Sequence, residues 1–136
     1  MLVTSVGADR VRSLEGVHLD LDPRITAVVG PNGAGKTNLV EAIYFGLTSK
    51  SFRTGDRRDL IPFGSSWARS RVGTESGQGS QHEFMAAVSR TEGTRFNMDG
   101  APIERSRAVD HRPMLAVFSP DRLEIVKGPP ANRRAH

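Results

Sequence analysis

The stretch Gly30-Pro31-Asn32-Gly33-Ala34-Gly35-Lys36-Thr37 decides the fold of this chain. Its spacing, G-x-x-x-x-G-K-[ST], is that of a phosphate-binding P-loop. The apolar, β-branched run Ile25–Val29 comes before it and predicts a buried strand. A helix from about Lys36 to Thr48 is predicted to follow it. The apolar face of that helix consists of Leu39, Ala42, Ile43 and Leu47. Strand, glycine loop and helix in this order are the structural context that the motif requires.

The physical chemistry of such a loop predicts a site for the phosphates of a nucleotide. The first N–H groups of a helix have no partner within the helix, and the aligned peptide dipoles leave partial positive charge there. Glycine lets the main chain curl around a phosphate with positive φ angles. Lys36 would reach the β- and γ-phosphates of ATP, and the Thr37 hydroxyl would be one ligand of Mg²⁺. The predicted phosphate cradle consists of Gly30, Asn32, Gly33, Ala34, Gly35, Lys36, Thr37 and Asn38.

Length and composition set the limits of the protein class. The 136 residues have room for one domain with its own core, or for part of a larger domain. The sequence has no run near the roughly 18 apolar residues of a membrane span, and its start lacks the segments of a secretory signal. The absence of cysteine excludes disulfides and fits a reducing cytoplasm. We therefore expect a cytoplasmic protein that has no membrane partner.

The basic balance of the chain permits binding to nucleic acid. The net charge is +4, and only three of the 19 Lys and Arg residues are lysines: Lys36, Lys50 and Lys127. A positive charge carried mainly by arginine suits binding to the phosphate backbone of DNA. A solvated surface of interleaved charges, as in Asp56-Arg57-Arg58-Asp59, explains these arginines as well. Charge alone leaves both interpretations open.

Alternating and apolar runs indicate how the rest of the chain is organised. We predict strands over residues 2–6, 17–21, 67–73, 83–90, 94–98, 101–103 and 114–118. Asp99-Gly100 predicts a two-residue hairpin turn, residues 104–112 a short polar helix, and Ser119 the start of another helix. The expected domain is an incomplete ATP-binding head over 1–136. It comprises a P-loop core (1–50), an antiparallel β insertion (about 67–103), and a strand, short helix and tail (114–136).

Three stretches resemble a known family. The string G-P-N-G-A-G-K-T-N-L-V-E-A-I, from Gly30 to Ile43, resembles the head domains of the SMC, Rad50, RecN and RecF group of ABC-type ATPases. Residues 11–21 look like the N-terminal hairpin of the RecF family of bacterial DNA replication and repair proteins. Residues 117–134 look like its Phe-x-Pro-Glu-Asp-Leu…Lys-Gly-x-Pro-x-x-Arg-Arg segment. The three stretches occur in the family's order and together span nearly the whole chain.

The resemblance implies a fold, cofactors and partners. The fold would be α/β: a partial P-loop NTPase head of ABC type with an antiparallel β subdomain inserted after the P-loop helix. ATP and Mg²⁺ would be the cofactors. The full-length family forms ATP-dependent homodimers on gapped or single-strand/double-strand junction DNA and works with RecO and RecR. Arg12 would contact the base or ribose, or else be a surface arginine of the hairpin. Glu41 is expected to face neighbouring strands or Arg12, with no catalytic role.

Several features depart from the family pattern. Val11 and Leu14 stand where the family has aromatic residues, and Asp121-Arg122 replaces Glu-Asp. The sequence has no Walker B run, and Ser76-Gly77-Gln78 only echoes a signature motif. The final residues look unlike a natural continuation of the family, which suggests truncation or a frameshift. We therefore expect at most weak binding of Mg·ATP and no appreciable turnover.

Two alternative interpretations stay open at the level of sequence. One is a self-contained P-loop NTPase or kinase of unknown substrate. A GTPase would need the motifs D-x-x-G and N-K-x-D, and neither occurs here. The other is a truncated, non-catalytic remnant that folds poorly and binds little.

Overall fold

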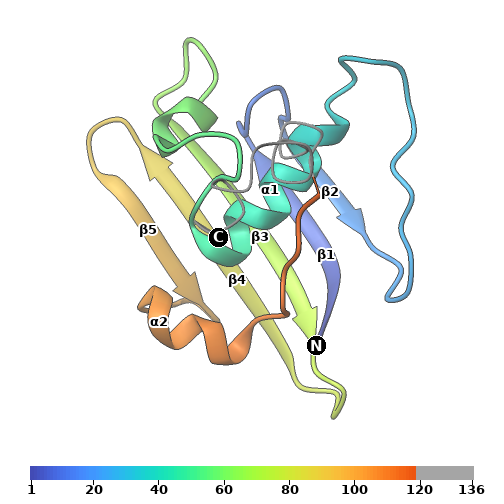
Figure 1. Ribbon diagram of the computed structural model, residues 1–136. Coiled ribbons are helices and arrows are strands. Elements are labelled where there is room, and N and C mark those ends of the chain that lie inside the picture. The colour runs from blue at the N-terminus through green and yellow to red at the C-terminus, as the bar shows by residue number, and fades with distance from the viewer. Residues whose placement is uncertain (119–136) are drawn as a thin grey trace, which may run out of the picture.

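A six-stranded antiparallel sheet organises the chain in the computed structural model, which describes residues 1–118 (Figure 1). The strands are β1 (Leu2–Asp9), β2 (Val17–Asp20), β3 (Trp67–Glu75), β4 (Gln81–Ser89), β5 (Gly93–Met98) and β6 (Ala101–Pro102). Their order across the sheet is β2-β1-β3-β4-β5-β6. The strands near the P-loop and those of the predicted β insertion thus belong to one continuous sheet.

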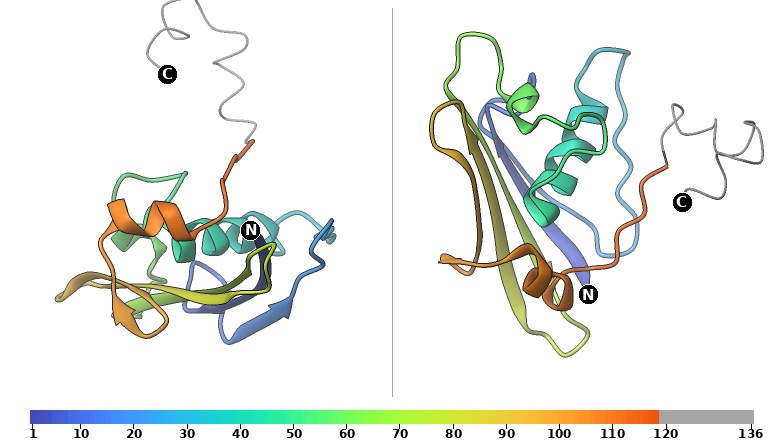
Figure 2. Two further views of the ribbon diagram at one scale, coloured as in Figure 1. Left: turned by 90° about the horizontal axis from the view of Figure 1, so that it is seen from below. Right: turned by 60° about the vertical axis from the view of Figure 1, so that its left-hand side comes forward.

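The helices lie on one face of this sheet (Figure 2). The helical elements are α1 (Lys36–Thr48), α2 (Arg105–Ala108) and two 3₁₀ turns, η1 (Arg57–Leu60) and η2 (Val109–His111). The predicted helix after the P-loop is therefore confirmed at both ends. The helix predicted over 104–112 forms as two consecutive short pieces, α2 and η2. None of the helices within residues 1–118 combines the length and the apolar character needed to cross a membrane.

Alternation of small or apolar side chains with polar ones creates the core. Successive side chains of a strand point to opposite faces, so every second residue of β1, β3 and β4 faces α1. The buried strand residues are Val6, Ala8, Ala68, Ser70, Val72, Thr74, Phe84, Ala86 and Val88, together with Phe96 of β5. From the helix, Leu39, Ala42, Phe45 and Leu47 complete this core. Leu39, Ala42 and Leu47 were predicted for this face, and Ile43 packs against it while partly buried.

Helix α1 approaches the sheet closely in the middle of β3. A Cβ atom at Gly46 would lie 2.5 Å from Cγ2 of Val72 and 2.9 Å from Oγ of Ser70. The Ser70 hydroxyl donates a buried hydrogen bond of 2.7 Å to the carbonyl oxygen of Ala42. The absence of a side chain at Gly46 thus brings the helix backbone within hydrogen-bonding distance of the strand.

The predicted hairpin turn at Asp99-Gly100 is confirmed. Both residues have positive φ angles, 51° and 80°, as a two-residue hairpin turn between β5 and β6 requires. The Asp99 carboxylate accepts a hydrogen bond of 2.8 Å from the backbone N–H of Glu83 and lies 2.8 Å from Nδ1 of His82. These contacts fasten the turn to the neighbouring strand β4.

Two predicted strands are wrong. The run Ile25–Val29, which we expected to be buried, has no regular structure, and Ile25 and Val29 are 81% and 87% exposed. The run 114–118 also lacks strand structure, and Met114 and Phe118 are 100% and 98% exposed. A buried strand needs a hydrogen-bonding neighbour, and no strand of residues 1–118 pairs with either run. The predicted helix start at Ser119 and the tail lie outside the described residues.

Candidate nucleotide-binding site

The P-loop curls tightly before it enters α1. Gly33 and Gly35 have φ angles of 84° and 94°, in the left-handed region that favours glycine. The backbone N–H of Ala34 points back to the carbonyl oxygen of Pro31 at 3.3 Å. Gly35 is the N-cap of α1, and no side chain caps the first N–H groups of this helix. These unpaired donors, together with the helix dipole, favour an anion at the start of α1.

Lys36 lies across the same loop. Its ammonium group donates hydrogen bonds of 2.8 Å to the carbonyl oxygen of Gly30 and 2.7 Å to that of Pro31. The next residue, Thr37, is exposed, so its hydroxyl is accessible from solvent. One cation, one hydroxyl and a row of unpaired amides thus lie within a few residues of each other. This donor set fits a phosphate group with an associated Mg²⁺ ion.

The bend after β1 packs directly against the start of α1. Val11 and Leu14 pair across this bend through hydrogen bonds of 3.1 and 2.9 Å between their backbones. A Cβ atom at Gly35 would lie 3.3 Å from both Cδ2 of Leu14 and Oγ of Ser13. The φ angle restricts this position to glycine, and a Cβ atom here would also be in tight contact with Leu14 and Ser13. The bend over residues 10–14 fixes the point at which the loop becomes a helix.

Arg12 and Glu41 form a bidentate ion pair that joins this bend to α1. Nε and Nη2 of Arg12 donate to the two carboxylate oxygens of Glu41, each at 3.1 Å. Nη1 of Arg12 donates to the carbonyl oxygen of Asp59 at 2.7 Å. The Glu41 side chain is fully buried, whereas that of Arg12 is 25% exposed. Glu41 was expected to face neighbouring strands or Arg12, and the structure shows the contact with Arg12.

The segment after α1 completes the surroundings of Glu41. Ser51 donates from its hydroxyl to Glu41 at 2.6 Å, and Nη1 of Arg53 donates to the same carboxylate at 3.0 Å. Arg53 also donates to the Asn38 side chain at 3.0 Å, and Asn38 in turn donates to Oγ of Ser13 at 2.8 Å. We call Arg12, Ser13, Asn38, Glu41, Ser51 and Arg53 the support network of the loop.

The support network keeps Glu41 ionised. Burial raises the pKa of this carboxyl, but hydrogen bonds from Arg12 and Ser51 and the charges of Arg12 and Arg53 outweigh it, so the pKa lies below its ordinary value. Both carboxylate oxygens are occupied by these donors. Glu41 therefore orients neighbouring segments, and it is not placed to take a proton from a bound ligand.

The predicted site residues fall into two groups. Residues 30–37 form the loop and the first turn of α1, as expected from their contiguity. The side chain of Asn38 instead contacts the bend and Arg53, so only its backbone belongs to the loop. Arg12 lies at the side of α1 with its guanidinium on Glu41, and its contact with a nucleotide base or ribose stays a prediction.

Ser13, Ser51 and Arg53 were missed, because no motif or period links them to the loop.

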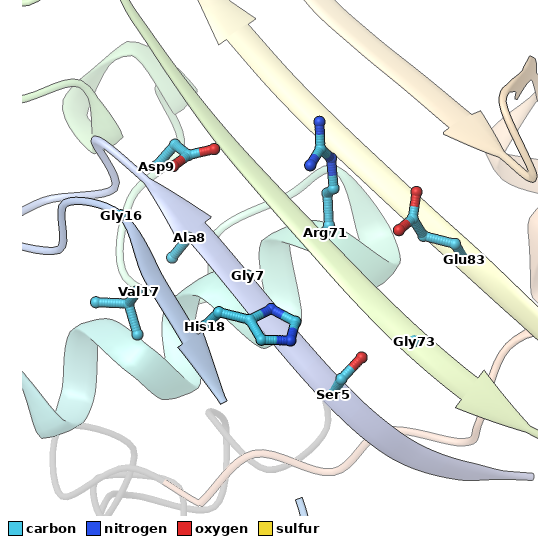
Figure 3. Close-up of a pocket in the computed structure, with 10 residues that line it drawn as sticks. All are labelled: Ser5, Gly7, Ala8, Asp9, Gly16, Val17, His18, Arg71, Gly73 and Glu83. Carbon is cyan, nitrogen blue, oxygen red and sulfur yellow. The ribbon is translucent and has the colours of Figure 1, made fainter. Parts of the chain in front are cut away.

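A hollow lies on the face of the sheet that points away from α1. It has a volume of about 210 Å³, and Figure 3 shows Arg71, Glu83 and His18 among the side chains that border it, over β1 to β4. A Cβ atom at Gly7 would meet the side chains of His18 and Arg71, which confirms that these residues share this outer face. None of the predicted site residues borders this hollow.

A comparison with protein families gives a match over nearly all the described residues. The family model of the RecF/RecN/SMC N-terminal domain matches residues 2–115. Among curated proteins, the DNA replication and repair protein RecF of Anaeromyxobacter sp. is 38% identical over 135 residues, which are 98% of this chain and 36% of that protein. RecF of Lacticaseibacillus casei is 36% identical over 124 residues, 90% of this chain and 33% of that protein. The chain thus spans about one third of the length of these relatives.

Solved structures share the fold. The structure of the recombination mediator protein RecF with ATP matches with a TM-score of 0.85 at 23% identity, over 98% of this chain and 36% of that chain. A chain from a study of ATP-driven dimerisation of SMC ATPases matches with a TM-score of 0.83 at 22% identity, over 99% of this chain and 96% of that one. The SMC head domain of Thermotoga maritima gives a TM-score of 0.66 at 23% identity, over 82% of this chain and 42% of that chain. The predicted fold class, a partial P-loop ATPase head of ABC type, is confirmed.

Proposed function

Because the chain belongs to the RecF/RecN/SMC N-terminal domain family, we propose that residues 30–37 bind the phosphates of Mg·ATP in a RecF-like protein of DNA replication and repair. In this proposal Lys36 neutralises the β- and γ-phosphates, and the Thr37 hydroxyl is one ligand of Mg²⁺. The backbone N–H groups from Gly33 to Asn38 complete the cradle.

One observation carries this proposal. The loop turns through positive φ angles at Gly33 and Gly35 and delivers the uncapped start of α1, with Lys36 lying across it. A glycine-rich turn that served only as a connection would need neither an uncapped helix start nor a lysine at this place. The structure of a RecF protein with ATP, which shares the fold, is consistent with this assignment.

We extend the proposal to partners that the family resemblance implies. The protein would form an ATP-dependent homodimer, as the SMC ATPases of the matching structure do on ATP binding. It would bind gapped or single-strand/double-strand junction DNA in the cytoplasm, together with RecO and RecR. The sequence of this chain has no Walker B run and no signature motif. We therefore expect the chain by itself to bind nucleotide weakly and to hydrolyse it at no appreciable rate.

Titration with a fluorescent ATP analogue in the presence of Mg²⁺ tests the proposal. We expect weak, saturable binding by the wild type, a loss of at least tenfold in affinity for Lys36→Ala, and no change for Arg95→Ala, an exposed arginine on the outer face of the sheet. Chelation of Mg²⁺ should weaken binding by the wild type. Equal affinity of wild type and Lys36→Ala would contradict the proposal. Hydrolysis that Lys36→Ala abolishes would favour a self-contained enzyme.

A further inference from the structure

A basic cavity lies at the end of α1 opposite the P-loop. The 13 residues of α1 separate the two places by roughly 20 Å, at about 1.5 Å per residue. The cavity has a volume of about 290 Å³. Its polar lining consists of Tyr44, Thr48, Lys50, Arg105, Ser106 and Arg112. A nucleotide held at the start of α1 would not reach it, so the cavity is a separate site.

Two arginines, Arg105 in the lining of this cavity and Arg57 near Arg105 but outside the lining, lack acidic partners within residues 1–118. Nε of Arg105 donates to the hydroxyl of Ser49, and Nε of Arg57 is buried with no hydrogen-bond partner. Within residues 1–118, neither guanidinium forms an ion pair with a carboxylate. Burial and the nearby charge of Arg57 lower the pKa of Arg105. Two cations held close together without an anion cost stability, which is the kind of local conflict expected at a binding site.

The surroundings of these arginines favour a polyanion with flat apolar groups. The Tyr44 ring borders the cavity and is held edge-on against Phe52 at 5.6 Å between ring centroids. Arg57 borders a different hollow with Arg58 and Arg90, and its charge acts on Arg105, so basic groups continue outside the cavity from Arg105. Asp56 in that hollow is already paired with Arg58 at 2.7 Å. Cations along a groove next to an aromatic ring are the usual binding surface for single-stranded nucleic acid.

We propose that this cavity and the adjoining surface at Arg57 bind single-stranded DNA, with a backbone phosphate between Arg105 and Arg57 and a base against Tyr44. The proposal rests on the DNA-binding part of the proposed function and names the surface that carries it. A phosphate ion offers the same chemistry as the backbone, so inorganic phosphate and an oligonucleotide are tested separately.

The first experiment uses inorganic phosphate and thermal unfolding, with ionic strength held constant by NaCl. The measurements are made on Lys36→Ala, which removes the P-loop cation, so that the P-loop contributes little. We expect phosphate to raise the Tm of this protein. Addition of Arg57→Met should raise the Tm in phosphate-free buffer, because a buried unpaired Nε and a repelled charge are removed while the apolar stem is kept. It should also abolish the increase caused by phosphate. A lower Tm for Arg57→Met, with the phosphate effect retained, would overturn the proposal.

The second experiment measures binding of a labelled single-stranded oligonucleotide by fluorescence anisotropy over a range of salt concentrations. Arg57→Met and Arg105→Gln should each reduce the slope of log K against log[salt] by about one. Tyr44→Ala should weaken binding about tenfold with the slope unchanged, and Tyr44→Phe should restore it, since stacking needs only the ring. Arg95→Gln, on the other face of the sheet, is the matched control and should have little effect.

The outcomes separate this inference from the proposed function. If the wild type binds the oligonucleotide and none of the cavity variants changes affinity or slope, the cavity is not the DNA surface, although the proposed function survives. If the wild type binds no DNA while phosphate still stabilises it through Arg57, the assignment to nucleic acid is overturned. The assignment to nucleic acid would also be overturned if polyglutamate bound as tightly as the oligonucleotide and if this binding depended on Arg57.

Discussion

At the scale of single residues, Glu41 joins three segments that surround the P-loop. Its carboxylate accepts hydrogen bonds from the bend after β1, through Arg12, and from the segment after α1, through Ser51 and Arg53. Every donor is polar or charged, and the acceptor is fully buried. A buried carboxylate of this kind stabilises the fold only while it is ionised and all its donors are in place.

We therefore predict that Glu41→Gln lowers the free energy of unfolding by about 2 kcal/mol at pH 7. The loss is below that of a fully buried pair, because the Arg12 and Arg53 side chains are 25% and 40% exposed and can hydrate. The exposed Glu83→Gln on the outer face serves as control and should change it by less than about 0.5 kcal/mol. Urea denaturation of the three proteins measures both differences.

The effect of Glu41 should depend on pH in a defined direction. The pKa of Glu41 is lowered in the folded chain, so its contribution is complete above its ordinary value of 4.5 and is lost as the pH falls below that value toward the folded pKa. The difference between wild type and Glu41→Gln should therefore shrink between about pH 5 and pH 3. A difference that stays constant over this range would show that the charge of Glu41 is not what stabilises the fold.

At the scale of elements, the sequence was informative where structure is local. Helix α1 begins at Lys36 because Gly35 ends the loop, and the hairpin turn forms at Asp99 because two positive φ angles favour Asp-Gly. Local sequence could not show whether an apolar run forms a strand, because a strand needs a hydrogen-bonding neighbour from a distant part of the chain. Ile25–Val29 has the composition of a buried strand, but composition does not say whether a neighbouring strand lies beside it. For the same reason, Ser51 and Arg53 could not be identified from motif or period as hydrogen-bond donors to Glu41, whereas Arg12 was expected beside it.

The close packing of α1 on β3 leads to a prediction at Gly46. Gly46→Ala should lower the free energy of unfolding by about 1–2 kcal/mol, because the new Cβ would overlap with Val72 and Ser70. This decrease is the net effect: the cost of the overlap is larger than the roughly 1 kcal/mol that alanine gains over glycine in a helix. Val40→Ala, on the exposed side of the same helix, should leave stability unchanged or slightly raise it. Chemical denaturation distinguishes the two, and a stabilised Gly46→Ala would mean that helix and strand can separate without cost.

At the scale of the whole molecule, two apolar runs place most of their large side chains outside the packed core, although Leu115 of the second run packs against it. The segments 25–29 and 114–118 run clear of the sheet (Figure 2). Ile25, Val29, Met114 and Phe118 together expose large apolar side chains to solvent. Exposed apolar surface of this kind favours association with another protein surface or with a second copy of the same chain.

We predict that the isolated chain self-associates in a concentration-dependent way. Ile25→Ser combined with Val29→Ser should reduce this association and leave the Tm within about a degree of the wild type, because neither side chain packs in the core. Phe63→Ser, in a different loop and equally exposed, is the control for removal of any apolar side chain. Sedimentation velocity over a concentration series gives the result. Association that both variants reduce to the same extent would contradict a role for these particular runs.

The bend after β1 has a consequence for how the site comes into being. Arg12 holds a left-handed backbone conformation with φ 56°, donates from its backbone to Leu60 and from its side chain to Asp59, 47 residues along the chain, and reaches Glu41 across 29 residues. Contacts of such long sequence separation close large loops of the chain, as the pairing of β1 with β3 also does, so they exist only in the folded molecule. The support of the phosphate cradle therefore depends on the folded state, and a nucleotide that binds the cradle protects folded molecules by mass action.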